Sequence, residues 1–357
     1  MPDKRRLLQT PVESFEVESG LTAEKILERM GGISFQGRNL ATAHSIWQKM
    51  LGDNCIIFLG VAGALSAGGL RLALAHLISY RYVDCVVSTG ANLYHDLHEC
   101  RGRHHYQGSP QTDDRALQAA HIDRVYDTLM DEDEFIDNDN WIADFAAGLE
   151  ARPYTSREFL YKLGGHLWRD TKRVGILTAA YRNQVPIFCP AIADSSIGMG
   201  LSQARHSTPG SGHIDVIGDI IESTNIVIRK RRTASVVLGG GTPKNFINQA
   251  SVEAEFYANG ISGHRYALQI VTDVPHFGGA SGSTLDEARS WGKVAVDADQ
   301  VTVNADVTLA LPLLASALAA TAPRPLEQRK IVTFGLGERV MSMDGVAFPE
   351  GRYEVEP

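Results

Sequence analysis

Residues 55–90 read CIIFLGVAGALSAGGLRLALAHLISYRYVDCVVSTG. The segment opens with a short apolar run, Cys55–Leu59, which has the length of a buried strand and ends at Gly60. A helical stretch follows over 68–79, where apolar residues recur at the spacing of one helix face: Leu70, Leu74, Leu77 and Ile78. A second strand-like run, Val83–Ser88, comes next. This strand–helix–strand order is typical of a parallel β-sheet whose strands are joined by helices.

The same alternation continues along the rest of the chain. A capping box at Thr155–Glu158 opens another helix. Four more apolar runs have strand length: Val185–Phe188, Ser235–Leu238, Tyr266–Val271 and Val301–Val303. This pattern predicts an α/β fold with a Rossmann-like, mainly parallel sheet of about six or more strands and helices on both faces. We expect a helical N-terminal segment over residues 1–50, a single catalytic domain over 51–343 and a surface extension over 344–357.

The charge balance argues against a nucleic-acid partner. The 357 residues carry a formal net charge of −8, and the sequence pI is about 5.8, whereas nucleic-acid-binding proteins usually have a basic excess. We expect the basic run Arg229–Arg232 to end a helix, where cations interact favourably with the dipole. We expect the acidic run Asp131–Glu134 to be a solvated loop.

Cysteine usage and hydropathy indicate a reducing, cytoplasmic setting without a membrane span. The cysteines form no CxxC pair, the N-terminus lacks the apolar core of a signal peptide, and no run of about 18 apolar residues occurs. His95 and His98 are three positions apart and could share a helix face, with His104 and His105 beyond them. No third ligand is placed with them and no HExxH motif occurs, so no metal site is predicted.

The residues that follow the expected strands are glycine, threonine and aspartate. Ligands of parallel α/β sheets gather at the carboxyl ends of the strands, so these residues are candidates for contacts with a nucleotide: Gly60, Thr89, Asp194, Gly239–Gly241, Thr272 and Asp306. We expect Thr89, Asp194 and Gly241 to converge on one cleft. The three glycines precede a helical segment, Asn245–Ala254, and would let backbone N–H groups approach a diphosphate. A tight turn without a ligand has the same pattern.

A second glycine-rich loop, Gly278–Ser283, leads into another capping box, Thr284–Glu287. Glu287 is therefore a candidate either for helix capping or for a functional contact. Trp291 follows four positions later, on the same helix face. Gly292 lets the backbone bend and presents Lys293 at the helix end, where a lysine commonly does no more than compensate the dipole.

The stretch Ser290-Trp291-Gly292-Lys293 resembles the SWGK motif of deoxyhypusine synthases. Asp286-Glu287-Ala288 before it and Val296-Asp297-Ala298 after it agree with that family. Further segments align in the same order: Phe35-Gln36, Ile57–Gly60, Val83-Asp84 with Ser88-Thr89, Pro190-Ala191 with Asp194, Leu238–Gly241, and Ala305-Asp306 before Leu311–Leu314. The resemblance covers roughly residues 30–320 and makes Lys293 a candidate nucleophile.

The resemblance implies NAD as the cofactor and a defined reaction. NAD oxidises a secondary amine of a polyamine such as spermidine, the motif lysine captures the resulting imine, and a diamine is released. The aminobutyl group then passes to an acceptor amine, and the NADH reduces the product imine. Lys293 carries over as the covalent catalytic lysine, with Glu287, Trp291 and Asn245 at substrate positions. The positions that contact NAD in the family are Thr89, Asp194, Gly239, Gly241, Thr272, Ser281 and Asp306.

Four positions depart from the family pattern. Met199 and Ala280 stand where aspartates bind spermidine, Asn245 replaces an active-site histidine, and His95 replaces a glutamate at the NAD site. The substrate could therefore be a diamine or agmatine, as in the related homospermidine synthases. Whether translation factor 5A, the eukaryotic acceptor, is a substrate stays open.

Three functions remain under consideration. The first is an NAD-dependent aminoalkyl transferase that acts on a small amine or a protein lysine, the second is an NAD-dependent amine dehydrogenase that releases NADH, and the third is a non-catalytic relative. The presence of Lys293 argues against the third. The family also forms homotetramers from tight dimers, with active sites at the dimer interface, so the resemblance implies such an assembly here.

Overall fold

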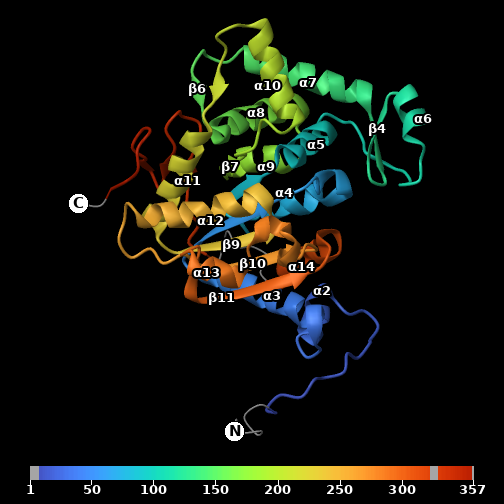
Figure 1. Ribbon diagram of the computed structural model, residues 1–357, viewed down its shortest axis with the longest axis vertical. Helices are drawn as coiled ribbons and strands as arrows, with labels where there is room; N and C mark the ends of the chain where they lie inside the picture. Colours follow the sequence, from blue (N-terminus) through green and yellow to red (C-terminus); the bar gives the residue numbers. More distant parts are fainter. Residues whose placement is uncertain (1–7, 322–328, 356–357) are drawn as a thin grey trace.

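The computed structural model describes residues 8–321 and 329–355. Six strands form a central sheet in the order β11-β10-β9-β1-β2-β7, and every neighbouring pair is parallel (Figure 1). Their bounds are β1 (Ile56–Val61), β2 (Cys85–Ser88), β7 (Ile187–Phe188), β9 (Thr233–Leu238), β10 (His264–Val271) and β11 (Val294–Asn304). All six strands expected from the sequence lie in this sheet, which confirms the α/β fold. Numbered along the chain, the order is 6-5-4-1-2-3, the doubly wound arrangement of Rossmann-type sheets.

The central strands are apolar because both faces of the sheet are covered. Every residue of β1 is buried. Ile57 and Leu59 face a core built with helices α3, α4 and α14, whereas Ile56 and Phe58 face a second core built with α11, α12 and the C-terminal segment. The bounds of the helices are α2 (Ala23–Met30), α3 (Phe35–Gly52), α4 (Arg71–Ser79), α5 (Gly90–Cys100), α7 (Glu132–Ala147), α8 (Ser156–Thr171), α9 (Ile176–Asn183), α10 (Ser196–Ser207), α11 (Val216–Lys230), α12 (Gly241–Glu255), α13 (Leu285–Ser290) and α14 (Val307–Thr321).

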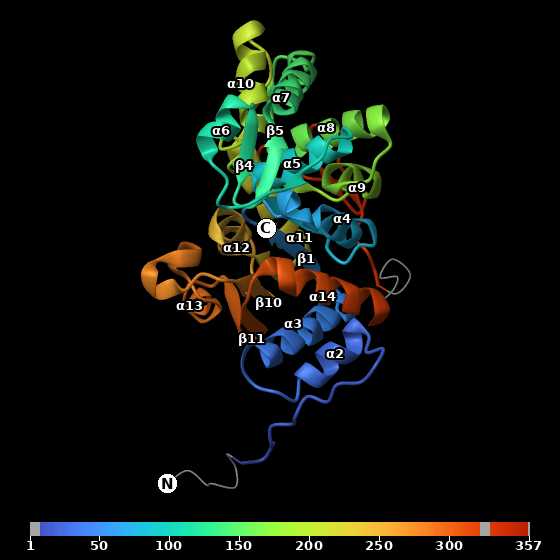
Figure 2. The same cartoon turned by 90° about the vertical axis from the view of Figure 1, so that its right-hand side faces the viewer.

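The segments at the two ends of the chain pack against the same body. Helices α2 and α3 lie beside α14 (Figure 2), while residues 8–22 form an exposed arm without helical structure. At the other end, strands β12 (Phe334–Gly335), β13 (Ser342–Met343) and β14 (Val346–Ala347) form a small antiparallel sheet. The residues beyond Met343 are anchored to it: Phe348 is buried, and Arg229 donates a hydrogen bond to the Val346 carbonyl.

Two smaller sheets complete the fold. Strands β3 (Tyr106–Gln107), β4 (Ile122–Val125) and β5 (Thr128–Asp131) form an antiparallel unit that projects from the body together with helix α6 (Asp114–Ala119) (Figure 1). Strands β6 (Pro153–Tyr154) and β8 (His213–Ile214) pair in parallel. Among the described residues, none of the helices combines the length and apolarity needed to cross a membrane. All four cysteines are buried as free thiols.

The structure corrects three expectations about local secondary structure. The acidic run is not a loop, because Asp131 caps α7 by accepting hydrogen bonds from the backbone N–H groups of Asp133 and Glu134; acidic side chains favour the positive end of a helix. The helix expected over 68–79 begins only at Arg71, since Gly69 has a φ of +86° within a preceding π-helical turn, Ser66–Leu70. Strand β11 starts at Val294, directly after Lys293, and not near 301.

Candidate active site

The cleft lies at the point where the strand order reverses. Strands β1 and β9 are neighbours in the sheet, but the chain leaves them toward opposite edges, so their carboxyl ends form the switch point where doubly wound proteins bind ligands. Two adjoining hollows open there. They share Ala62, which follows β1, and Gly241, which begins α12.

The seven residues predicted to contact NAD all line these hollows. Thr89 and Asp194 line the hollow beside β2 and β7, and Gly241 lines both hollows. Gly239, Thr272, Ser281 and Asp306 line the hollow beside β10 and β11. The predicted convergence of Thr89, Asp194 and Gly241 on one cleft is therefore confirmed as geometry.

The glycine turn between β9 and α12 requires glycine at two positions. Gly239 has a φ of +87° and Gly241 a φ of +61°, and a Cβ on Gly239 would lie 3.0 Å from the Cβ of Ala62. Gln269 holds the turn by donating a hydrogen bond from Nε2 to the Gly239 carbonyl over 2.8 Å. Helix α12 begins at Gly241, so its first N–H groups, which lack partners within the helix, lie at the shared point of the two hollows. These residues fit the diphosphate of a dinucleotide.

Asn92 supports the wall of the cleft and was missed by sequence reasoning. It lies buried in α5 and donates hydrogen bonds from Nδ2 to the Gly63 carbonyl over 3.0 Å and to Thr89 Oγ1 over 2.9 Å. Thr89 in turn donates from Oγ1 to the same Gly63 carbonyl over 2.7 Å. The loop after β1 is thereby fixed against α5. An asparagine inside a helix gives no sequence signal for such a role.

Asp306 combines a capping role with an exposed position in the cleft. Its Oδ1 accepts hydrogen bonds from Thr308 N and Thr308 Oγ1, each over 2.6 Å. These hydrogen bonds hold the pKa of Asp306 below its ordinary value. The carboxylate therefore stays charged at the end of β11, as a group that accepts hydrogen bonds from ribose hydroxyls should.

The predicted catalytic lysine and the three predicted substrate residues lie elsewhere in the single chain. Glu287 caps α13, accepting from the Thr284 N–H over 2.7 Å, so its capping interpretation is correct. Trp291 is 67% exposed, and Lys293 Nζ lies 5.2 Å from the centroid of its ring, within cation–π range. Asn245 lies in the early part of α12. None of these four residues lines either hollow.

A second lysine lies in the first turn of α12, just after the glycine turn that lines the cleft. Lys244 is 1% exposed, and its Nζ donates a hydrogen bond to the Ser283 carbonyl over 2.9 Å. Burial lowers the pKa of Lys244, the charge of Lys293 lowers it further, and Glu287 opposes the shift. Sequence reasoning missed this lysine, because burial of a lysine depends on tertiary packing.

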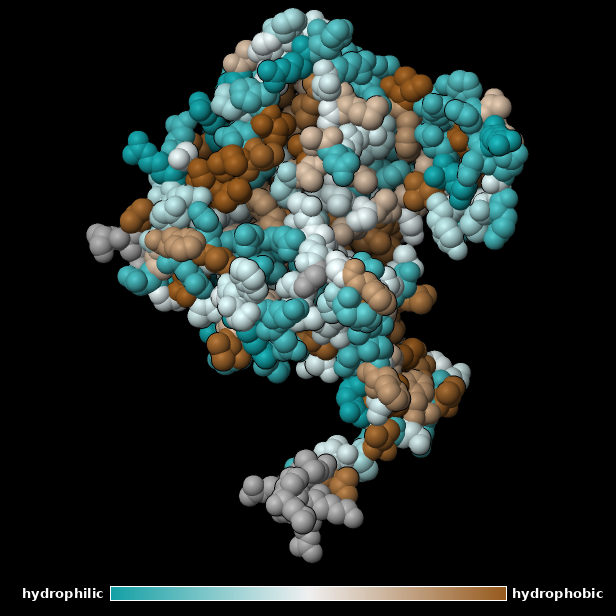
Figure 3. Space-filling model, in the orientation of Figure 1, coloured by the Kyte–Doolittle hydropathy of each residue, from teal (hydrophilic) through white to brown (hydrophobic). Residues whose placement is uncertain are grey.

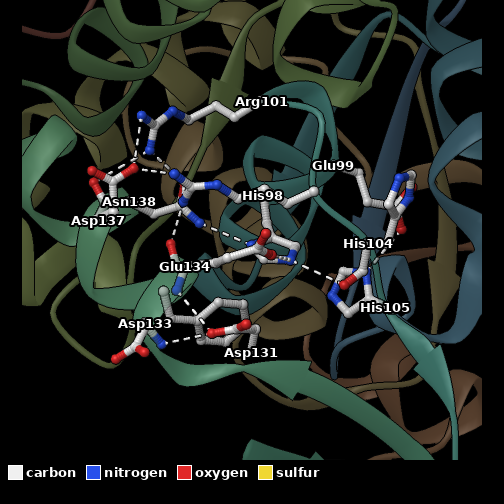
Figure 4. A network of polar contacts seen from close by, with 12 residues as sticks. His98, Glu99, Arg101, His104, His105, Asp131, Asp133, Glu134, Asp137 and Asn138 are labelled. Carbon is white, nitrogen blue, oxygen red and sulfur yellow. Dashed lines mark hydrogen bonds and ion pairs between the residues drawn. The ribbon is translucent and has the colours of Figure 1, made fainter. Parts of the chain in front are cut away.

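Among the residues that depart from the family pattern, Met199, Asn245 and His95 also fall outside the hollows. Met199 is 61% exposed on α10, and the side chain of Ala280 lies outside what the structure describes. His95 is buried in α5 among other rings: its Nδ1 lies 2.9 Å from His105 Nε2. Figure 4 shows the polar network that surrounds the neighbouring His98, with Asn138 and Glu134 of α7 on one side and His105 on the other.

The hydrogen bonds of this histidine network fit neutral rings. His105 Nδ1 lies 2.8 Å from Glu99 Oε1, so its N–H points to the carboxylate and its Nε2 accepts from His95. His98 lies with Nε2 3.2 Å from the His104 carbonyl and Nδ1 3.0 Å from Asn138 Nδ2. Burial lowers the pKa of both His95 and His98 to about 4. Within residues 8–321 and 329–355, no cluster of three or more His, Cys, Asp or Glu side chains could hold a metal ion.

The fold and the cleft define a doubly wound α/β protein with a cleft at its switch point. Comparison with known families narrows this class. The model of the deoxyhypusine synthase family matches residues 25–318. The chain therefore belongs to the deoxyhypusine synthase family, whose members are transferases.

Similar proteins come from archaea and bacteria. A "Probable deoxyhypusine synthase 2" of Methanosarcina acetivorans is 46% identical over 310 residues, which cover 86% of this chain and 89% of that protein. A "Deoxyhypusine synthase-like protein" of Coxiella burnetii is 42% identical over 323 residues, with 88% and 90% covered. A crystal structure from Entamoeba histolytica, assigned to the deoxyhypusine synthases, has a TM-score of 0.59 at 19% identity and covers 87% of this chain and 97% of that one. This last likeness supports the fold alone.

Proposed function

We propose that this chain is an NAD-dependent aminoalkyl transferase that acts on a polyamine through an imine on Lys293. The observation that carries the proposal is the cleft, where seven residues at family NAD positions line two adjoining hollows. The N-terminus of α12 supplies N–H groups for a diphosphate, and Asp306 and Asp194 supply carboxylates for ribose hydroxyls. The proposal places the reaction in the cytoplasm, in keeping with four cysteines that are free thiols.

The chemistry assigns roles to Lys293, Trp291 and Glu287. NAD bound in the cleft would accept a hydride from the carbon beside the secondary amine and return it at the end of the cycle. The neutral ε-amino group of Lys293 attacks that carbon once it is an imine, and the diamine leaves with its nitrogen. An acceptor amine then attacks the same carbon and releases Lys293. The exposed indole of Trp291 holds an ammonium group of the substrate, and Glu287 pairs with another.

Assembly is part of the proposal. Large apolar side chains are exposed on several elements, including Trp291 at 67%, Met199 at 61% and Ile217 at 61%. Figure 3 shows apolar surface gathered near the start of α11. Exposed apolar area of this kind marks interfaces, and a homotetramer built from dimers would bring residues of a second copy to Lys293. Light scattering that returned a monomer at every concentration would contradict this.

The donor amine is proposed to be smaller or less charged than spermidine. Met199 is exposed and apolar, so it offers no carboxylate to a third ammonium group. This observation favours a homospermidine synthase-type reaction that uses diamines or agmatine, with a small amine rather than translation factor 5A as the acceptor.

One experiment separates the transferase from an amine dehydrogenase. The protein is incubated with NAD and a panel of amines, and the products are identified by mass spectrometry while absorbance follows NADH. A transferase yields a new polyamine with no net NADH, because the hydride returns to the product. Stoichiometric release of NADH without a larger amine would favour the dehydrogenase.

A further inference from the structure

The turn that carries Lys293 is fixed through its backbone on both sides. The Lys293 N–H donates to the Ala288 carbonyl of α13 over 3.0 Å, and the Lys293 carbonyl accepts from the His264 N–H over 3.0 Å. His264 is the first residue of β10. The lysine backbone is thus held between a short helix and the start of a central strand, at a point where the pairing of β10 and β11 is irregular, between His264 and Tyr266.

Gly263 packs directly against the backbone of this turn. It has a φ of +80°, and a Cβ added there would meet the Gly292 oxygen at 2.7 Å, the Val294 carbonyl carbon at 2.8 Å and the Ala295 nitrogen at 2.9 Å. All three are backbone atoms of the segment that contains Lys293. Because backbone cannot rotate out of the way as a flexible side chain can, any side chain at 263 would displace that segment.

The ring of His264, the next residue, contacts strand β9 and helix α12. It is fully buried, with Nδ1 2.8 Å from Thr233 Oγ1 on β9 and Nε2 3.3 Å from the Ile247 carbonyl on α12. One neutral tautomer satisfies both contacts, donating from Nε2 and accepting at Nδ1. Thr233 begins β9 and Ile247 lies in α12, and the Gly239–Gly241 turn joins the far end of β9 to α12, so the histidine contacts both elements that carry the glycine turn of the cleft.

We infer that Gly263 and His264 are positioning residues that seat Lys293 relative to the dinucleotide cleft. The inference rests on the proposed function, because it matters only if Lys293 reacts with a substrate held beside the cofactor. A displacement of about 1 Å at a reacting atom can cost on the order of a hundredfold in rate. Gly263 and His264 should therefore control the rate at which Lys293 captures the imine, while cofactor binding stays intact.

Gly260 provides a matched control in the same loop. It has a φ of +77°, close to that of Gly263, but a Cβ there would meet nothing nearer than Arg231 Nη1 at 3.8 Å. Gly260→Ala and Gly263→Ala therefore introduce similar backbone strain, and only Gly263→Ala pushes on the lysine turn. Borohydride trapping of the Lys293 adduct, NAD titration and thermal melting are measured for both variants and the wild type.

The expected result is that Gly263→Ala slows adduct formation by about a hundredfold at a temperature where both variants are folded, whereas its NAD affinity matches that of Gly260→Ala; its Tm falls below that of Gly260→Ala, because the added Cβ displaces backbone atoms. His264→Gln keeps the backbone N–H but loses the ring contact to Thr233, and it should slow trapping by a smaller factor. Trapping at the wild-type rate in both variants would overturn the inference, and so would equal losses of trapping and NAD binding. A wild-type protein that formed no adduct with any amine would instead overturn the proposed function, and the inference with it.

Discussion

The buried ammonium group of Lys244 donates a hydrogen bond to the backbone carbonyl of Ser283 over 2.9 Å. Lys244 lies in the first turns of α12, at the positive end of the helix dipole, where a cation is unfavourable. Burial adds a further cost for the charge. A cation kept in such a place points to a functional demand, and its contact with Ser283 joins α12 to the loop that carries Ser281.

Replacing Lys244 should weaken cofactor binding. In Lys244→Met the Ser283 carbonyl loses its donor, and the loop beside the cleft loosens. We expect the NAD dissociation constant to rise by about tenfold, which corresponds to one hydrogen bond from a charged group. Calorimetric titration measures it. Lys49→Met, which removes an exposed lysine paired with Asp299, should leave the affinity unchanged, and an unchanged affinity in Lys244→Met would contradict the prediction.

The order of the strands could not be predicted from the sequence, although each strand could. Apolar runs such as Cys55–Leu59 mark buried strands because both sheet faces are covered. The position of β1 beside β9 depends on tertiary contacts between residues far apart in the chain. Once that order is known, the cleft follows, and the strand-end residues Thr89, Asp194 and Asp306 lie where the pattern placed them.

Local chemistry explains where sequence reasoning failed. The start of β11 was missed because Asp297 and Asp299 interrupt its apolar pattern. Asn92, Lys244 and His264 were missed because polar residues inside regular elements look like surface residues until burial is known. The roles of Lys293 and of the three residues assigned to the substrate, Glu287, Trp291 and Asn245, came from the family resemblance, and the geometry of the single chain does not bring these four residues into the cleft.

The substitution Asp306→Asn removes the charge of the side chain but keeps its capping hydrogen bond to α14. In Asp306→Asn the amide oxygen still accepts from the Thr308 N–H, since asparagine caps helices as well as aspartate does. Loss of the carboxylate should weaken NAD binding by about tenfold or more, because a charged hydrogen bond to a ribose hydroxyl is lost. The Tm should change little.

The control for this prediction is Asp113→Asn. Asp113 caps α6 in the same way, accepting from the Arg115 N–H over 3.0 Å, in the projecting unit of the fold. It should affect neither NAD affinity nor Tm. If both variants bound NAD as the wild type does, Asp306 would have no role in cofactor binding.

The buried histidines predict a loss of stability in mild acid. Burial lowers the pKa of His95, His98 and His264 from the ordinary value of 6.5 to about 4. Because the folded state holds these rings neutral, their contribution is fully present above about pH 6.5 and is lost as the pH falls toward 4. Tm should therefore drop by several degrees between pH 7 and pH 5.

Two variants test whether the buried histidines cause this acid sensitivity. His98→Gln removes one buried titrating ring and should reduce the drop in Tm, although it lowers Tm at pH 7. His121→Gln replaces a histidine that is 64% exposed and should leave the drop unchanged. A Tm of the wild type that did not vary between pH 7 and pH 5 would show that these rings do not govern stability.

Met199 and Ala280 test the choice of amine. Restoring aspartate at both positions should tighten spermidine binding by about tenfold, because a carboxylate forms charge-assisted hydrogen bonds with an ammonium group. Calorimetry with NAD present measures the affinity. Asparagine at both positions has a similar shape without the charge and should give no gain. Equal affinity in all three proteins would mean that these positions do not contact the amine.

The decisive substitution is Lys293→Arg. Arginine keeps a cation above the ring of Trp291, where the ammonium of Lys293 lies 5.2 Å from the centroid, and it keeps the backbone hydrogen bonds of the turn. It cannot be deprotonated in a protein, so it cannot attack an imine. With NAD and a competent amine, borohydride should add one substrate fragment to Lys293 in the wild type and none in the variant, and turnover should fall by at least about a thousandfold. NAD affinity should stay the same, because Lys293 does not line the cleft. A lysine that only compensates the helix dipole would tolerate arginine with full activity, so the two roles predict opposite outcomes for one substitution that preserves charge.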